Sequence, residues 1–310
     1  MKLVFCGTPE FAVPSLEKLV EARFDLCLVL SQPDRPQGRG MELTAPPVKQ
    51  SALRLGLPVI QPEKIRNNEE LQQQLVTLRP DAIIVVGYGR IIPPWMLDLP
   101  RFGNINVHAS LLPKYRGAAP IQWAIASGET ITGVTTMKLD EGLDTGAILL
   151  QRQIPIGPED TAITIAPRLA TLGAELLVET LHGLEQGSVS PVPQDHSRAT
   201  LAPILKKEDG QVDFSRTATE SYNRLRGFQP WPGAYTQFRG RNLKIMSARP
   251  APESIPLAAG ELGMVGDRLL VGCGAGAALE LLQVQPEGKK AITAREFMSG
   301  YRPAPGEKLG

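Results

Sequence analysis

Residues 82–86, Ala82-Ile83-Ile84-Val85-Val86, form an uninterrupted apolar run in which four of the five side chains are β-branched. Such a run is typical of a strand buried on both faces, as in a parallel sheet. Apolar runs and helical patterns alternate around it, and we predict strands at 2–6, 26–31, 58–60, 105–108, 133–139 and 147–156, and helices at 15–22, 48–55, 71–78, 121–126 and 161–184. Because parallel strands need crossover helices, this alternation predicts an α/β fold with a Rossmann-like, doubly wound, mostly parallel sheet.

The pattern changes after residue 187. Residues 187–203 are rich in Pro, Ser and Gln, which is typical of a linker. A helix is predicted at 217–226, and the short β runs that follow, at 234–238, 243–248, 269–271 and 279–284, are typical of a small OB-like β-barrel. We therefore predict a catalytic domain over residues 1–187, a linker over 188–210 and an OB-like domain over 211–310.

The composition, with 42% hydrophobic and 21% charged residues, is that of a soluble globular protein. No apolar run approaches the ~20 residues of a membrane-spanning helix, and the first residues predict a strand and not a secretory signal. Three widely spaced cysteines do not form a disulfide framework. These features predict a cytoplasmic protein with no membrane partner. Residues 207–310 hold 14 Lys and Arg against 11 Asp and Glu, a bias that permits contacts with phosphate without demonstrating them.

The stretch that carries chemistry runs from Asn104 to Gly117 and reads Asn-Ile-Asn-Val-His-Ala-Ser-Leu-Leu-Pro-Lys-Tyr-Arg-Gly. Asn106 and His108 lie two residues apart in a predicted strand, so their side chains point to the same side. The strand ends where open α/β sheets bind their ligands. A strand-end histidine alone is more often structural, but the neighbouring amide and the turn at 110–113 favour a catalytic pair. An amide donor beside an imidazole suits acyl or formyl transfer.

A second loop, residues 139–146, carries three acids directly after a predicted strand. Asp144, 36 residues after His108 (144 minus 108), supplies a carboxylate for the same site. The acids lack the alternate spacing of a calcium loop, and no His pair or Cys-x-x-Cys has metal-ligand spacing, so no metal is predicted. The glycines after the first strand do not match a dinucleotide-binding fingerprint, which disfavours NAD.

Residues 31–40, Ser-Gln-Pro-Asp-Arg-Pro-Gln-Gly-Arg-Gly, form a cationic loop of a length that tends to be functional. On composition alone, two interpretations are equally open. The loop is either an ordinary exposed connection or a segment whose arginines insert against nucleic acid.

Taken together, the motifs resemble those of the methionyl-tRNA formyltransferases, which are folate-dependent formyltransferases, over nearly the whole chain. The core motif consists of Asn106, His108 and the turn Ser110-Leu111-Leu112-Pro113, with Asp144 in the acid loop. The loop at 33–40 and the C-terminal domain reached through Lys206 and Lys207 resemble the features that separate the tRNA enzymes from other formyltransferases.

The resemblance implies transfer of a formyl group from 10-formyltetrahydrofolate to the α-amino group of initiator methionyl-tRNA, and we expect a monomer. It implies that Asn106 and a protonated His108 donate to the oxyanion, and that Asp144 orients or charges His108 and relays a proton. The implied binding residues are Ser110, Leu111, Leu112 and Pro113 for folate, and Arg39, Lys206 and Lys207 for tRNA. Met41 and Glu42 stand where the family usually carries lysine, so we expect weaker attraction of phosphate by this loop.

Three other functions stay open. A sugar-nucleotide amine formyltransferase would use the same catalytic core and the same folate donor. A formyltetrahydrofolate hydrolase would release formate without an acceptor. A non-catalytic tRNA-binding protein would keep the fold, but the presence of Asn106, His108 and Asp144 argues against it.

Overall fold

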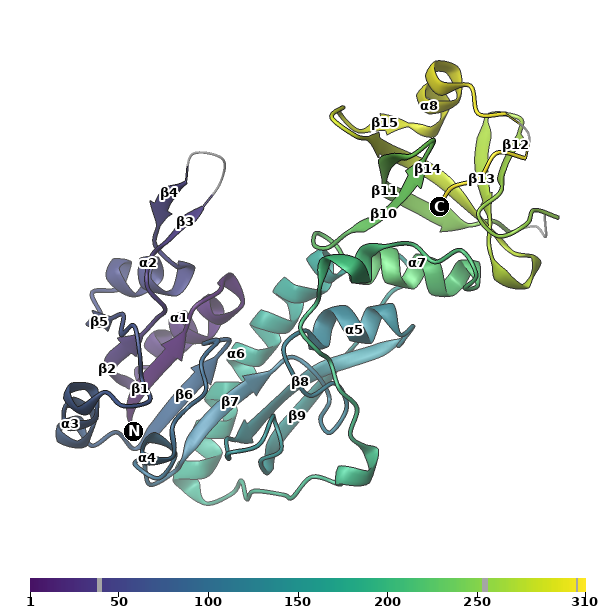
Figure 1. Ribbon diagram of the computed structural model, residues 1–310. Helices are drawn as coiled ribbons and strands as arrows, with labels where there is room; N and C mark the ends of the chain where they lie inside the picture. The colour runs from purple at the N-terminus through teal and green to yellow at the C-terminus, as the bar shows by residue number, and fades with distance from the viewer. Residues whose placement is uncertain (38–40, 253–255, 305) are drawn as a thin grey trace. The chain divides into compact units, whose positions relative to one another are not determined.

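The computed structural model describes residues 1–37, 41–252, 256–304 and 306–310, which form two compact units (Figure 1). The first unit comprises residues 1–117, 131–154 and 166–202, and the second comprises residues 118–130, 155–165 and 203–310. The predicted bounds of the linker, 188–210, stay a prediction. Within the described ranges, no helix combines the length and the apolar character that crossing a membrane requires.

A seven-stranded sheet forms the centre of the first unit. Its strands are β1 (Lys2–Gly7), β2 (Asp25–Leu30), β5 (Val59–Ile60), β6 (Ala82–Val86), β7 (Asn104–His108), β8 (Ile131–Lys138) and β9 (Ile148–Pro155), in the spatial order β5-β2-β1-β6-β7-β8-β9. The first five in this order pair in parallel, and β8 is antiparallel to β7. The side chains of β6 are at most 7% exposed, as its apolar sequence predicts. The mostly parallel α/β sheet is confirmed.

The helices α1 (Val13–Glu21), α2 (Pro47–Arg54), α3 (Glu69–Leu78) and α4 (Pro94–Leu97) lie between strands of this unit in sequence, and α6 (Ala162–Gln186) follows β9. In α3, Leu71 and Leu75 are four residues apart, so they share one helix face and pack into the core that includes Ile83 of β6. This helix begins two residues earlier than the sequence predicted, because the Asn68 side chain caps it by accepting the Leu71 N–H at 3.0 Å.

The predicted loop after β2 contains a hairpin of two three-residue strands, β3 (Arg35–Gln37) and β4 (Glu42–Thr44). The hairpin does not join the main sheet and stands out beyond α2 (Figure 1). Its base is anchored by the Asp34 carboxylate, which accepts hydrogen bonds from Lys49 Nζ at 2.8 Å and Gln61 Nε2 at 2.7 Å. These two donors hold the pKa of Asp34 below its ordinary value.

The second unit is built on an antiparallel sheet. Its strands are β10 (Ala234–Phe238), β11 (Arg241–Pro250), β12 (Leu262–Val265), β13 (Arg268–Gly272), β14 (Ala278–Pro286) and β15 (Ile292–Thr293), in the order β10-β11-β14-β13-β12 with β15 beside β14. The helices of this unit are α5 (Pro120–Ala126), α7 (Ala218–Gly227) and α8 (Ala294–Tyr301). Phe238 and Phe297, whose ring centroids are 5.1 Å apart, lie in its core. A β domain after the α/β domain is confirmed.

Candidate active site

The site lies at the carboxyl end of β7. The side chains of Asn106 and His108 alternate with Val107 and are 9% and 6% exposed. Parallel pairing with β6 fixes the register of Asn106 opposite Val85, while His108 lies opposite Thr135 of β8. Among the described residues, the Asn106 amide makes no side-chain hydrogen bond. Its N–H groups are therefore available to an oxygen of a bound molecule.

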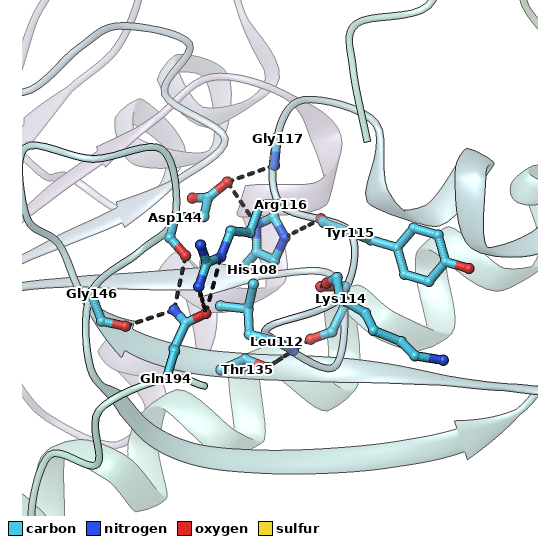
Figure 2. A network of polar contacts seen from close by, with 11 residues as sticks. His108, Leu112, Lys114, Tyr115, Arg116, Gly117, Thr135, Asp144, Gly146 and Gln194 are labelled. Atoms are coloured by element: carbon cyan, nitrogen blue, oxygen red, sulfur yellow. Dashed lines mark hydrogen bonds and ion pairs between the residues drawn. The ribbon is translucent and has the colours of Figure 1, made fainter. Parts of the chain in front are cut away.

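Both ring nitrogens of His108 face groups of the protein. Nε2 is 2.9 Å from the carbonyl oxygen of Tyr115, which only accepts, so Nε2 carries a proton and donates it. Nδ1 lies 3.7 Å from the Asp144 carboxylate, whose side chain is 14% exposed (Figure 2). The structure thus brings together the predicted histidine and carboxylate, which are 36 residues apart in sequence.

The Asp144 loop is held in an unusual backbone conformation. Asp144 has a φ of +52°, a region that residues other than glycine seldom occupy. Its Oδ2 accepts the N–H of Gly117 at 2.8 Å (Figure 2). Gly117 itself has a φ of +121°, and a Cβ there would lie 2.7 Å from the carbonyl oxygen of Ala202, so only glycine fits. The carboxylate is therefore oriented by a backbone donor that the quoted motif supplies.

The turn at 110–113 is stabilised by Thr135 of β8. The Thr135 hydroxyl donates to the Ser110 carbonyl at 2.7 Å and accepts the Leu112 N–H at 3.1 Å. Gln151 Nε2 donates to the Leu112 carbonyl at 2.9 Å and to Thr135 Oγ1 at 2.8 Å. The two main-chain polar groups of Leu112 are thus both occupied within the protein.

This packing separates the four residues that the sequence assigned to folate. Ser110 is fully buried and its hydroxyl donates to the Lys114 carbonyl at 2.6 Å, and Leu112 is only 3% exposed. Leu111 and Pro113 are half-buried. The turn therefore offers the side chains of Leu111 and Pro113 to a bound molecule, whereas the side chains of Ser110 and Leu112 hold the turn in shape.

Two residues of the site were missed by the sequence analysis. Gln194 donates to the carbonyl oxygens of Asp144 and Gly146 at 2.8 and 2.7 Å, and Arg116 donates to Gln194 Oε1 at 2.7 Å (Figure 2). Arg116 stands inside the quoted motif, so its position next to Gly117 was a usable signal. Gln194 lies in the predicted linker, where nothing in the local sequence indicates a contact with residue 144.

Lys206 and Lys207, two of the three residues assigned to nucleic acid, belong to the second unit. Lys206 and Lys207 are exposed, and Lys206 precedes the short 3-10 helix Lys207–Gly210, where its N–H donates to Asp209 Oδ2 at 2.7 Å. Arg39 falls outside the described residues. The part of the chain that the structure describes contains no group of three or more His, Cys, Asp or Glu side chains suited to a metal ion.

Comparison with known proteins identifies the family. The formyl transferase family model matches residues 1–181, and the model of the formyl transferase C-terminal domain matches residues 204–302. A methionyl-tRNA formyltransferase from Koribacter versatilis (strain Ellin345) is 66% identical over 310 residues, which cover 100% of this chain and 99% of the relative. The enzyme of that name from Acidobacterium capsulatum is 59% identical over 310 residues, and the match covers both chains completely.

Among solved structures, the N-formyltransferase from Helicobacter canadensis in complex with folinic acid and dTDP-3-aminofucose superposes with a TM-score of 0.70. It is 20% identical, and the match covers 92% of this chain and 99% of that one. At this identity the likeness shows the fold alone. The two family models and the full-length relatives decide the assignment: the chain belongs to the formyl transferase family, among the methionyl-tRNA formyltransferases.

Proposed function

We propose that this chain transfers the formyl group of 10-formyltetrahydrofolate to the α-amino group of methionine on initiator tRNA, giving N-formylmethionyl-tRNA. The observation that carries the proposal is the arrangement at the end of β7. There the Asp144 carboxylate lies 3.7 Å from His108, next to an Asn106 amide that forms no hydrogen bond within the described residues. The full-length similarity to enzymes of this name supports the choice of both substrates.

Asn106 is proposed to stabilise the tetrahedral intermediate. When the amine attacks the formyl carbon, the formyl oxygen gains negative charge, and a side-chain N–H at this position donates to it. Loss of one such donor typically raises the barrier by about 3 kcal/mol. The burial of Asn106, which is 9% exposed, keeps the amide oriented and reduces screening by water.

His108 is proposed to act through its charge. Its Nε2–H donates to the Tyr115 carbonyl, so direct donation to the oxyanion, the role that the resemblance implied, requires that contact to be exchanged. The protonated ring that the resemblance implied carries a positive charge, and this charge stabilises the negative charge developing near Asn106, while the Asp144 carboxylate lies 3.7 Å from Nδ1. Asp144 thus places a negative charge beside the ring, and the Tyr115 carbonyl holds Nε2 at 2.9 Å.

No covalent enzyme intermediate is needed, because the amine is itself the nucleophile. A bond forms between the α-amino nitrogen and the formyl carbon, and the bond from that carbon to N10 of the folate breaks. The proton lost by the amine ends on N10, and Asp144 relays it through water. The protein's main contribution is to hold amine and formyl carbon in contact.

The donor and acceptor are proposed to bind on different parts of the chain. The half-buried side chains of Leu111 and Pro113, the backbone at 86–88 and the loop at 140–144 enclose the pterin. Arg39, Lys206 and Lys207 contact tRNA phosphates, and the exposure of the two lysines leaves their ammonium groups accessible. Because initiator tRNA takes part in translation, we propose that the protein acts in the cytoplasm; we also propose that it is a monomer.

The experiment that tests the proposal supplies the purified protein with 10-formyltetrahydrofolate and either one of two acceptors or no acceptor. Initiator Met-tRNA is expected to become formylated at the α-amino group, as detected by mass spectrometry of the released amino acid. Formylation of a nucleotide-linked amino sugar in its place would support the sugar-amine alternative. Formate release with no acceptor would support a hydrolase.

A further inference from the structure

The Gln194 side chain connects the Asp144 loop to Arg116 in the segment that follows β7. Gln194 follows α6 in sequence and is 6% exposed. Its Nε2 donates to the main-chain carbonyls of Asp144 and Gly146, at 2.8 and 2.7 Å, and its Oε1 accepts from Arg116 Nε and Nη2, at 3.1 and 2.7 Å (Figure 2). Four hydrogen bonds thus converge on one buried side chain.

The chemistry of these partners fixes the orientation of the amide. Carbonyl oxygens only accept and a guanidinium only donates, so the nitrogen of Gln194 must face Asp144 and Gly146 while its oxygen faces Arg116. Glutamate would place a second acceptor against two carbonyls, and methionine would contribute neither donor nor strong acceptor. The position therefore requires the amide of glutamine at this side-chain length.

The arginine that holds Gln194 is also buried. Arg116 is 6% exposed, and no carboxylate among the described residues pairs with it. Its Nη2 donates to Gln194 Oε1 and to His196 Nδ1, the latter at 3.1 Å. Because burying a charge costs free energy unless its donors are satisfied, these contacts hold Arg116 and, through it, the Gln194 amide in one orientation.

The Asp144 backbone needs such support. With a φ of +52°, Asp144 occupies a conformation that persists only when its surroundings enforce it. Gln194 binds its carbonyl, and the Gly117 N–H binds its carboxylate at 2.8 Å. Gln194 therefore fixes the main chain of Asp144, and Gly117, from a separate segment, fixes its side chain.

We propose that Gln194, oriented by Arg116, is a positioning residue that sets the backbone of the Asp144 loop and thereby holds the Asp144 carboxylate against His108. This inference rests on the proposed formyl transfer, in which Asp144 acts on His108. Gln194 touches neither substrate in this account, so its removal changes the rate of the chemical step and leaves donor binding unchanged.

Two variants separate the contacts of Gln194. Gln194→Met removes all four hydrogen bonds at similar length, whereas Gln194→Glu keeps the acceptor toward Arg116 and removes the two donors. Both are expected to lower kcat roughly 10- to 100-fold, the effect of displacing a catalytic group by about 1 Å, with the KM for the folate donor close to that of the parent. Gln74→Met, at an exposed position of α3, is the matched control and is expected to behave as the parent.

A readout that does not depend on turnover is the backbone amide of Gly117. In the parent this N–H is bonded to a carboxylate, so we expect a downfield proton resonance and slow exchange with solvent. Both Gln194 variants are expected to shift this resonance upfield and speed its exchange. If Gln194→Met does not fold, the kcat and the Gly117 amide of Gln194→Glu alone decide whether Gln194 positions Asp144. An unchanged Gly117 amide, or a kcat within about twofold of the parent in both variants, would overturn the proposal. If the parent formylates no Met-tRNA, the proposed function fails, while the Gly117 comparison still decides the positioning.

Discussion

The substitution Asp144→Asn tests how much the carboxylate contributes to the reaction. Asparagine keeps an oxygen that accepts the Gly117 N–H but removes the charge that faces His108 at 3.7 Å. At that separation, and at an effective dielectric constant of about 20, a carboxylate and an imidazolium attract each other by about 4 kcal/mol. If the imidazolium is needed in the transition state, loss of this attraction lowers kcat roughly 10³-fold.

The assay is steady-state formylation with the concentrations of donor and Met-tRNA varied in turn. We expect Asp144→Asn to lower kcat while the KM for 10-formyltetrahydrofolate stays near the parent value, because the substitution preserves the shape of the loop. Asp25→Asn, the same change at an exposed position of β2, is the control and is expected to leave kcat unchanged. A kcat for Asp144→Asn within about tenfold of the parent would mean that the Asp144 charge does not act on His108 in the transition state.

Three further predictions concern the turn, the loop and the second unit. Thr135→Val removes the hydroxyl that accepts the Leu112 N–H and donates to the Ser110 carbonyl. We expect the free energy of unfolding, measured by chemical denaturation, to fall by about 1–3 kcal/mol and the KM for the folate donor to rise. An unchanged KM contradicts this prediction. Arg39→Ala is expected to weaken tRNA binding, to reduce the salt dependence of that binding by about one phosphate contact, and to leave folate affinity unchanged. Weaker folate binding with unchanged tRNA binding would mean that the loop does not contact tRNA. Burial raises the pKa of Glu280, but hydrogen bonds from two arginines outweigh it and hold the pKa below its ordinary value. The contacts of Glu280 with the two arginines therefore stabilise the fold at a pH above the ordinary carboxyl pKa, and this stabilisation is lost as the pH falls through the lowered pKa of Glu280. Glu280→Gln is expected to lower the melting temperature at pH 7 and to lower it less in acid. An equal decrease at both pH values contradicts this prediction.

Regular elements with a strong local pattern were predictable from the sequence. The apolar run at 82–86 is a central strand with the predicted bounds. The hairpin of β3 and β4 was not predicted, because strands of three residues are too short to show alternation. Helix α8 was also missed, although Thr293 and Glu296 form a capping box at its start, a signal present in the sequence.

Site residues could be predicted where the signal is local in sequence, and they could not be predicted where it depends on a distant contact. Asn106 and His108 were found because alternation along one strand puts them on the same side, and the structure places both in the site. Gln194 was not found, because its contact with Asp144 spans 50 residues and depends on how the segment after α6 returns to the sheet. Ser110 carried the pattern of a binding turn, but its side chain is fully buried and bonds to Lys114.

The most direct test of the central claim is the transfer of labelled formyl from 10-formyltetrahydrofolate to initiator Met-tRNA by the purified protein, compared with the Asn106→Ala and Asp144→Asn variants. The parent is expected to form N-formylmethionyl-tRNA, and either variant is expected to form it at least about two orders of magnitude more slowly. A parent that forms no N-formylmethionyl-tRNA, or two variants that form it at the rate of the parent, would contradict the proposed roles of Asn106 and Asp144 in formyl transfer.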